Sequence, residues 1–238
     1  MPTFVLVHGA WHGGWCWSKV VSLLREAGHV VEAPDLPAHG ADAAAPADVA
    51  LSDYCDRVCE VIDSLEGDVV LVGHSLGGVT ITQAAARRTE RIRSLVYLAA
   101  FLPDPEAAFA PDETMTSPEL VAAVSPSADG ATLLFDPRAA RLVFYEDCSD
   151  QDVAFACERL CAEPASLVSG PVQLSPDGAG VPRDYILCLR DRALLPSGQR
   201  ALIDRHGCRN VYEMDSNHSP FFSAPEELAR ILGEIAGP

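Results

Sequence analysis

Six short apolar runs alternate along this chain with stretches whose apolar residues recur at helical spacing. Between the first two runs, apolar residues from Trp17 to Leu24 recur one helical turn apart, and Gly28 provides a left-handed helix stop. Because strands joined by helices pair in parallel, the alternation predicts an α/β fold with a mostly parallel sheet of about six strands flanked by helices. The predicted strands cover residues 3–7, 29–33, 69–72, 94–99, 184–189 and 209–213.

The alternation stops between Pro103 and about Val181, where Pro, Ala, Asp and Ser become frequent. This stretch also carries several leucine and aromatic residues, which make it too apolar for a solvated linker. Since 238 residues suffice for one domain with an insertion, we expect residues 103–181 to form an inserted, mainly helical cap on a core of residues 1–102 and 182–238. Its helical pieces are predicted at residues 117–124, 137–144 and 150–162.

Acidic residues outnumber basic ones in this chain by 34 to 17, which gives a formal charge of −17 at pH 7. The basic residues are scattered singly, whereas a protein that binds a phosphate backbone needs a basic patch, so we expect no nucleic-acid partner. The single lysine, Lys19, lies in a helical pattern away from the motifs described below, and Schiff-base chemistry is therefore set aside.

No apolar run reaches the roughly 20 residues of a membrane span. The chain also opens directly into the first apolar run, without the basic segment of a signal peptide. We therefore expect no membrane association and a cytoplasmic location, where the eight cysteines would be reduced. Cys55 with Cys59, and Cys157 with Cys161, have i, i+4 spacing, but no neighbouring histidine completes a zinc pattern, so we expect no metal site.

The motif Gly73-His74-Ser75-Leu76-Gly77 follows the third apolar run and precedes a helical stretch. A Gly-x-Ser-x-Gly motif between a strand and a helix is typical of a nucleophile elbow, in which the serine adopts strained backbone angles and its hydroxyl projects above the sheet. Only small residues fit two positions away on either side of such a turn. Ser75 is therefore the candidate nucleophile.

A serine hydroxyl is a poor nucleophile at neutral pH and needs a base that an acid orients, and in folds with this turn both follow the serine in the chain. Two histidines lie downstream of Ser75. His206 ends a predicted helix, where a cation would interact with the helix dipole. His218 lies in a loop before the last helix, which we expect to begin at a capping box at residues 223–226. We therefore predict His218 as the base.

The acid is expected on a loop after one of the later strands. Asp191 directly follows the fifth apolar run, from where its carboxylate could reach an imidazole on the loop after the next strand. Asp215 lies only three residues before His218, where a turn role is more natural, and Asp104 follows the fourth run. We predict Asp191 as the acid, with Asp215 and Asp104 as alternatives.

Attack on an ester creates an alkoxide that two N–H groups must stabilise. One is expected from Leu76, which follows the serine at the helix N-terminus. The other is expected from Ala10, in the loop after the first strand. Four further histidines are interpreted as structural, the first two as braces of that loop: His8, His12, His39 and His74.

These motifs resemble those of the α/β-hydrolase fold enzymes, and within them a branch that contains plant methyl esterases, bacterial esterases and plant hydroxynitrile lyases. The resemblance covers most of the core and, more loosely, the predicted cap; the matching segments are residues 4–17, 30–40, 69–78, 94–105, 185–200 and 213–222. It implies a triad of Ser75, Asp191 and His218. It also implies that Ala10 and Leu76 supply the oxyanion amides and that no cofactor is needed.

Two departures from the lyases favour an esterase. The lyases carry a threonine after the histidine of the first strand and a lysine after the triad histidine, whereas this chain has Gly9 and Ser219 at these positions. Without a cation to stabilise departing cyanide, lyase chemistry loses its main electrostatic aid.

The substrate pocket is expected between these motifs and the cap. By the resemblance, Phe101 borders the serine, and aromatic residues of the cap add apolar surface, although some of them only seal the cap onto the sheet. Such a pocket favours small apolar or aromatic esters over long acyl chains. The candidate substrate-binding residues are Gly9, Trp11, Phe101, Phe109, Phe135, Phe144, Tyr145 and Ser219.

The sequence therefore predicts a carboxylesterase that cleaves a small-molecule ester through a serine nucleophile and an acyl-enzyme. Two alternatives stay open: cyanohydrin or other C–C bond cleavage on the same triad, and a small-molecule receptor that keeps the fold. Steady multiple turnover of an activated ester would separate the enzyme from the receptor. The sequence does not determine the oligomeric state, and a homodimer is the assembly to be tested.

Overall fold

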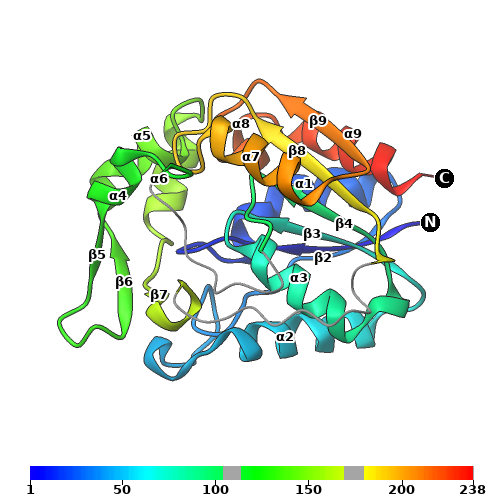
Figure 1. The fold of residues 1–238 in the computed structure, drawn as a ribbon, viewed down its shortest axis with the longest axis horizontal. Helices are drawn as coiled ribbons and strands as arrows, with labels where there is room; N and C mark the ends of the chain where they lie inside the picture. Colours follow the sequence, from blue (N-terminus) through cyan, green and yellow to red (C-terminus); the bar gives the residue numbers. More distant parts are fainter. Residues whose placement is uncertain (104–113, 169–179, 238) are drawn as a thin grey trace.

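The computed structural model describes residues 1–103, 114–168 and 180–237. Its main sheet has six strands in the order β2-β1-β3-β4-β8-β9, and all neighbours pair in parallel (Figure 1). Each strand overlaps one of the six predicted runs, so the predicted α/β fold is confirmed. The strands are β1 (Thr3–Val7), β2 (Val30–Glu32), β3 (Val69–His74), β4 (Ile92–Leu98), β8 (Arg183–Cys188) and β9 (Asn210–Met214).

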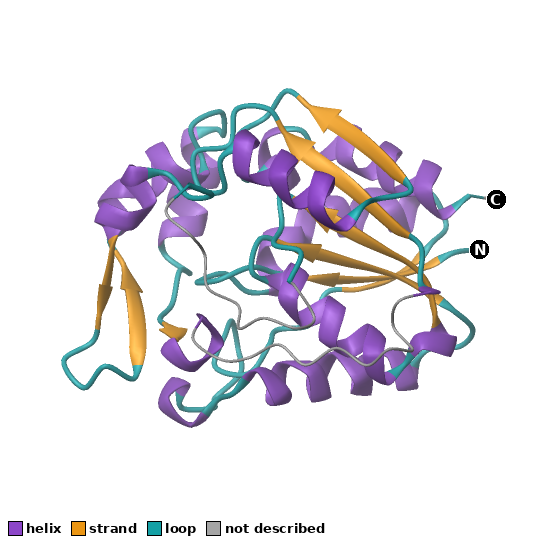
Figure 2. Ribbon diagram, viewed as in Figure 1, coloured by secondary structure: helices purple, strands orange, loops and turns teal. Residues whose placement is uncertain are grey.

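Helices cover both faces of this sheet (Figure 2). Successive side chains of a strand point to opposite faces, and β1 is buried on both. Phe4 and Leu6 belong to the core on one face, and Val5 and Val7 to the core on the other. The first face is covered by α1 (Ser18–Glu26) and α9 (Pro225–Ala236), the second by α2 (Leu51–Ser64), α3 (Gly77–Arg87) and α7 (Pro196–His206).

The described residues 114–168, which we call the insert, lie between β4 and β8 in the chain. The three predicted helical pieces are present, although the last one ends at Cys157. The insert also holds an antiparallel sheet, ordered β5-β6-β7, that the sequence analysis did not predict. The elements are α4 (Pro118–Ala123), β5 (Val124–Pro126), β6 (Thr132–Phe135), α5 (Ala140–Phe144), α6 (Asp150–Cys157) and β7 (Glu163–Pro164).

Short helical turns complete the described part of the chain: η1 (Gly14–Trp17), η2 (Pro46–Asp48), η3 (Thr89–Arg91), η4 (Pro137–Ala139), η5 (Ala165–Val168) and α8 (Pro220–Ser223). The last of these corrects the predicted capping box. Ser223 ends α8 instead of capping the next helix, and α9 begins at Pro225 with no side-chain hydrogen bond at Ala224.

Among the described helices, none combines the length and apolar character that a membrane crossing requires.

The start of α3 packs so closely on two loops that it admits no side chain. A Cβ at Gly77 would lie 2.6 Å from the carbonyl oxygen of His8, and one at Gly78 only 2.2 Å from that of Phe101. Both neighbours are backbone atoms, which cannot move aside as a flexible side chain can. Gly233, in α9, has open space around the same position.

We expect Gly78→Ala to lower the free energy of unfolding by about 1–3 kcal/mol, because the added methyl group overpacks this contact. The matched variant Gly233→Ala should raise it by about 0.5–1 kcal/mol, since alanine costs less backbone entropy in a helix. Urea denaturation of both variants measures the difference. A Gly78→Ala protein as stable as the parent would contradict the close packing of α3.

Candidate active site

Ser75 lies in a sharp turn between β3 and α3, at the carboxyl edge of the sheet. Its φ angle is +53°, in the left-handed region that residues with a side chain rarely adopt. A Cβ at Gly73 would lie 2.7 Å from the carbonyl oxygen of Gly77, which explains why small residues flank the turn. The strained strand–turn–helix geometry predicted for Ser75 is therefore present.

Three backbone hydrogen bonds hold Ser75 in place. Its N–H donates to the carbonyl of Leu98 (3.2 Å), and its own carbonyl accepts from the N–H groups of Gly78 and Phe101, both at 3.1 Å. The loop after β1 also approaches the serine, because a Cβ at Gly9 would lie 2.7 Å from the Cβ of Ser75. The predicted oxyanion residues follow Gly9 and Ser75 directly, and Leu76 lies at the N-terminus of α3.

Asp191 and His218, the predicted acid and base, form a hydrogen-bonded pair. The distance between His218 Nδ1 and Asp191 Oδ2 is 2.8 Å, and both residues are buried. Asp191 Oδ1 also accepts from the N–H groups of Ala193 (2.7 Å) and Leu194 (3.0 Å), while Gln199 donates to Oδ2 (3.0 Å). With Nδ1–H committed to the carboxylate, Nε2 of the neutral ring is free to accept a proton.

Of the two alternative acids, Asp215 lies elsewhere. Asp215 is exposed and pairs with Arg190 at 2.7 Å, and Asp104 lies outside the described residues.

The loop of His218 contacts the turn that holds Ser75. His74, in that turn, donates from Nε2 to the carbonyl of His218 at 2.9 Å. The rings of His74 and His218 have their centroids 4.5 Å apart.

Two further predicted histidines brace the loop after β1. His8 accepts from the N–H of Leu36 (3.1 Å), and His12 donates from Nδ1 to the carbonyl of Ala10 (2.7 Å), so their interpretation as loop braces is confirmed. Burial lowers the pKa of His8 well below its usual range and that of His12 to about 3. Both rings therefore stay neutral at neutral pH.

An aromatic cluster connects the insert to the proposed base. Trp11 lies 5.5 Å from Phe135, Phe135 lies 4.6 Å from Phe144, and Phe144 lies 5.6 Å from His218, measured between ring centroids. These side chains are predicted pocket residues, and one of them, Phe144, lies beside the imidazole. The hydroxyl of Tyr145, in contrast, is bound to His12 at 2.6 Å.

The remaining predicted pocket residues lie at different places. Phe101 is nearly buried, and its backbone is bonded to Ser75. Ser219 is fully buried, and among the described residues no group bonds its hydroxyl. Phe109 lies outside the described residues.

Sequence reasoning missed one buried group, Glu163 of β7. Its carboxylate accepts from the N–H of Trp11 (2.9 Å), from His39 Nε2 (2.9 Å) and from the hydroxyl of Tyr54 (3.3 Å). Burial alone would lower the pKa of His39, but hydrogen bonds with Cys161 and Glu163 raise it to about 10. His39 and Glu163 therefore form a buried ion pair at neutral pH. A single glutamate without a local motif offered no signal for this role.

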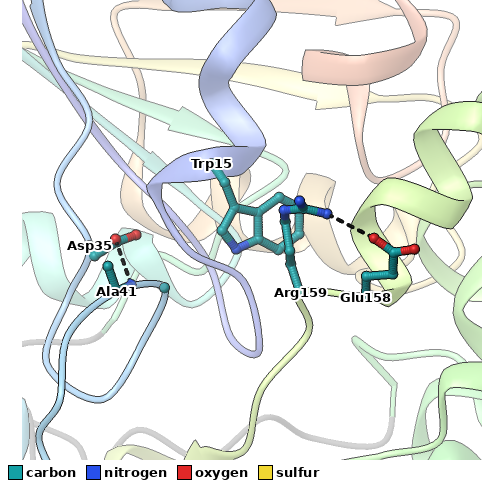
Figure 3. A pocket seen from close by; sticks show the side chains of 6 residues that line it. Trp15, Asp35, Ala41, Glu158 and Arg159 are labelled. Atoms are coloured by element: carbon teal, nitrogen blue, oxygen red, sulfur yellow. Dashed lines mark hydrogen bonds and ion pairs between the residues drawn. The ribbon is translucent and has the colours of Figure 1, made fainter.

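A hollow of about 430 Å³ lies elsewhere, between the loop after β2 and the end of α6 (Figure 3). Asp35 in this hollow already accepts from the N–H groups of Gly14 (2.7 Å) and Ala41 (2.9 Å). The predicted triad is not part of its lining, so we assign it no catalytic role. Its lining residues are Trp15, Asp35, Gly40, Ala41, Glu158 and Arg159.

All eight cysteines lie in the described residues, and no disulfide joins them there. Burial raises the pKa of Cys55 and of Cys148 to about 12, and that of Cys208 to about 11. In the described part of the chain, no group of three or more His, Cys, Asp or Glu side chains is placed to hold a metal ion.

Comparison with known proteins decides the family. The profile of the Alpha/beta hydrolase family matches residues 4–231. The chain belongs to the α/β-hydrolase family.

Similar proteins are named as a methylesterase, a salicylic acid-binding protein and a pyrethroid hydrolase. Methylesterase 7 of Arabidopsis thaliana is 35% identical, and the alignment covers 98% of this chain and 95% of that protein. Salicylic acid-binding protein 2 of Nicotiana tabacum is 34% identical over 98% of this chain and 96% of its own length. The crystal structure of a pyrethroid hydrolase from Sphingobium faniae superposes with a TM-score of 0.89 at 27% identity, covering 99% of this chain and 97% of that one.

Asp191→Asn should lower kcat for an activated ester by about 10⁴-fold, because an amide facing Nδ1–H no longer selects the productive tautomer of His218. Asp215→Asn should leave kcat within about twofold, since this exposed residue pairs only with Arg190 among the groups described above. Steady-state kinetics of the two variants measure the contrast. The larger loss in Asp215→Asn would show that the acid is wrongly assigned.

The ion pair of His39 gives a testable pH dependence of stability. Because folding raises the pKa of His39 from 6.5 to about 10, its contribution is complete below pH 6.5 and is lost progressively as the pH rises to about 10. We expect the free energy of unfolding to fall between pH 7 and 8.5. This pH range lies below the ordinary cysteine pKa of 9.0, so that the titration of His39 is observed before that of the thiols. The variant His39→Gln should lack this decline. Urea denaturation at several pH values gives the free energy of unfolding of both proteins, and an equal decline in parent and variant would contradict the ion pair.

Proposed function

We propose that this chain is a serine carboxylesterase that acts without a cofactor. The observation that carries the proposal is the strained Ser75 at the elbow together with the 2.8 Å pair of Asp191 and His218 on the neighbouring loops. The family membership of this chain and its methylesterase relatives also support ester hydrolysis. We place the triad at Ser75, Asp191 and His218.

In the proposed mechanism, His218 Nε2 takes the hydroxyl proton as Ser75 Oγ attacks the ester carbonyl. The protonated ring, which Asp191 stabilises, then gives this proton to the departing alcohol. Water attacks the acyl-enzyme with His218 again as the base, and the acid leaves. His218 then gives the proton taken from water to Ser75 Oγ, so the triad returns to its starting state.

The negative charge on the carbonyl oxygen would be held by the N–H groups of Ala10 and Leu76. Leu76 contributes from the N-terminus of α3, where the helix dipole favours an anion. Ala10 contributes from the loop that Gly9 allows to approach Ser75.

The substrate class we propose is small apolar or aromatic esters. The cluster of Trp11, Phe135 and Phe144 supports it, because these packed aromatic rings place apolar side chains next to the proposed base. The names of a methylesterase and a pyrethroid hydrolase among similar proteins also point to small esters. We propose that residues 103–181 act as the cap that limits acyl length.

Two alternatives are less well supported. Lyase chemistry lacks both of the lyase residues named above. A threonine at position 9 would collide with Ser75, and position 219 carries a serine instead of the lysine. A receptor function is suggested by the name of the salicylic acid-binding relative. Turnover separates this function from an esterase, because a receptor binds one ligand per site without releasing product.

Ser75→Ala should reduce turnover of p-nitrophenyl acetate by about 10⁴-fold or more, because it removes the nucleophile and leaves almost no cavity. Ser94→Ala, which deletes a buried hydroxyl in β4, should keep full activity. Retention of a tenth of the activity in Ser75→Ala would refute the assignment.

The same assay can test the substrate class. For the parent protein, kcat/KM should fall along p-nitrophenyl esters from C2 to C12, and mandelonitrile should not be cleaved. A rise toward C12 would indicate an open groove and contradict the cap. A cytoplasmic location and a homodimer remain predictions from the sequence.

A further inference from the structure

The peptide bond between Ala10 and Trp11 is held at both of its polar ends. The N–H of Trp11 donates to Glu163 Oε2 at 2.9 Å, and the carbonyl of Ala10 accepts from His12 Nδ1 at 2.7 Å. Trp11 has a φ angle of +61°, which is unfavourable for a residue with a side chain. Contacts from outside the loop must therefore stabilise this conformation.

Those contacts come from the insert. Glu163 belongs to β7, and Tyr145 directly follows α5. Because His12 Nδ1 donates to the Ala10 carbonyl, its Nε2 accepts, and the Tyr145 hydroxyl is the donor at 2.6 Å. The carbonyl of Trp11 also accepts from the N–H of Cys161 at 3.0 Å. The insert thus binds the loop directly at Trp11 and His12, and it reaches the carbonyl of Ala10 through His12.

The charge of Glu163 is compensated from the core side. Its side chain is fully buried, and His39 Nε2 lies 2.9 Å from Oε2. Tyr54 donates to Oε1 at 3.3 Å. An unpaired carboxylate bound to the amide next to Ala10 would repel the negative charge that develops on the substrate oxygen. With His39 beside it, Glu163 orients the peptide without placing a net charge near that oxygen.

We propose that Glu163 and Tyr145 are positioning residues of the oxyanion hole. By fixing the Ala10–Trp11 peptide, they keep the preceding N–H of Ala10 directed at the oxyanion above Ser75. This inference rests on the proposed esterase function. It gives the insert a role in the rate of the reaction in addition to its role as a cap, because oxyanion donors act only when they are placed within a fraction of an ångström.

Glu163→Gln tests the first contact, because the amide keeps the size of the side chain but is neutral beside His39 and offers one acceptor oxygen to three donors, Trp11, His39 and Tyr54. We expect kcat to fall about 10- to 100-fold while KM changes less than threefold, since the contact is realised in the transition state. Tyr145→Phe removes a single oxygen and should lower kcat about 3- to 10-fold in the same way.

Asp184→Asn is the matched control. Asp184 is also fully buried and ion-paired, with Arg209, but it lies near the start of β8, at the opposite edge of the sheet from Ser75. It should lower stability while leaving kcat within about twofold. Equal kcat losses in Asp184→Asn and Glu163→Gln would assign the effect to general destabilisation and overturn the proposal.

A second readout does not need turnover. In the folded parent protein without substrate, the Trp11 amide should exchange slowly with deuterium by NMR, and Glu163→Gln should accelerate this exchange at least tenfold while Asp184→Asn should not. Unchanged exchange would refute the contact, and Tyr145→Phe carries the kinetic test if Glu163→Gln does not fold. A parent protein that neither turns over esters nor reacts with a fluorophosphonate at Ser75 would instead refute the esterase function.

Discussion

The placement of Ser75 depends on backbone segments that approach one another more closely than a Cβ atom allows. The loops after β1 and β4 meet the elbow at Gly9, Gly77 and Gly78, where an added Cβ would lie 2.2–2.7 Å from its nearest neighbour. These contacts are steric, so salt and pH do not weaken them. They fix the serine relative to both loops, and the hydrogen-bonded pair of Asp191 and His218 lies on the loops after β8 and β9, at the same carboxyl edge of the sheet.

Much of this arrangement could be predicted because it follows from local pattern. Buried parallel strands such as β3 are continuous apolar runs, and the elbow motif sits between such a run and a helix. Asp191 was preferred to Asp215 because it directly follows a predicted strand, and in the structure Asp191 lies next to His218. The antiparallel strands of the insert were missed because they are two to four residues long, although Asp129 and Gly130 mark the turn between β5 and β6.

Other features could not be predicted because their partners are distant in the chain. Glu163 is 152 residues from Trp11 and 124 residues from His39, and no spacing rule connects them. The capping box failed for a different reason. Pro220 begins a separate turn in which Ser223 is the last residue, so the serine is no longer at the helix start. The core thus follows from periodicity, whereas the way in which the insert meets it depends on tertiary contacts.

Trp11 joins the proposed pocket to the proposed oxyanion loop, since its ring contacts Phe135 and its N–H is bound to Glu163. Changes of the insert that alter substrate fit would therefore also alter the rate.

The buried cysteines have a separate consequence for chemical labelling. Because burial holds the pKa of Cys55, Cys148 and Cys208 at about 11 to 12, hardly any thiolate forms at these positions near neutral pH. Reagents that attack thiolates should therefore react slowly at these three positions, and a covalent probe of the serine can be used without first blocking them.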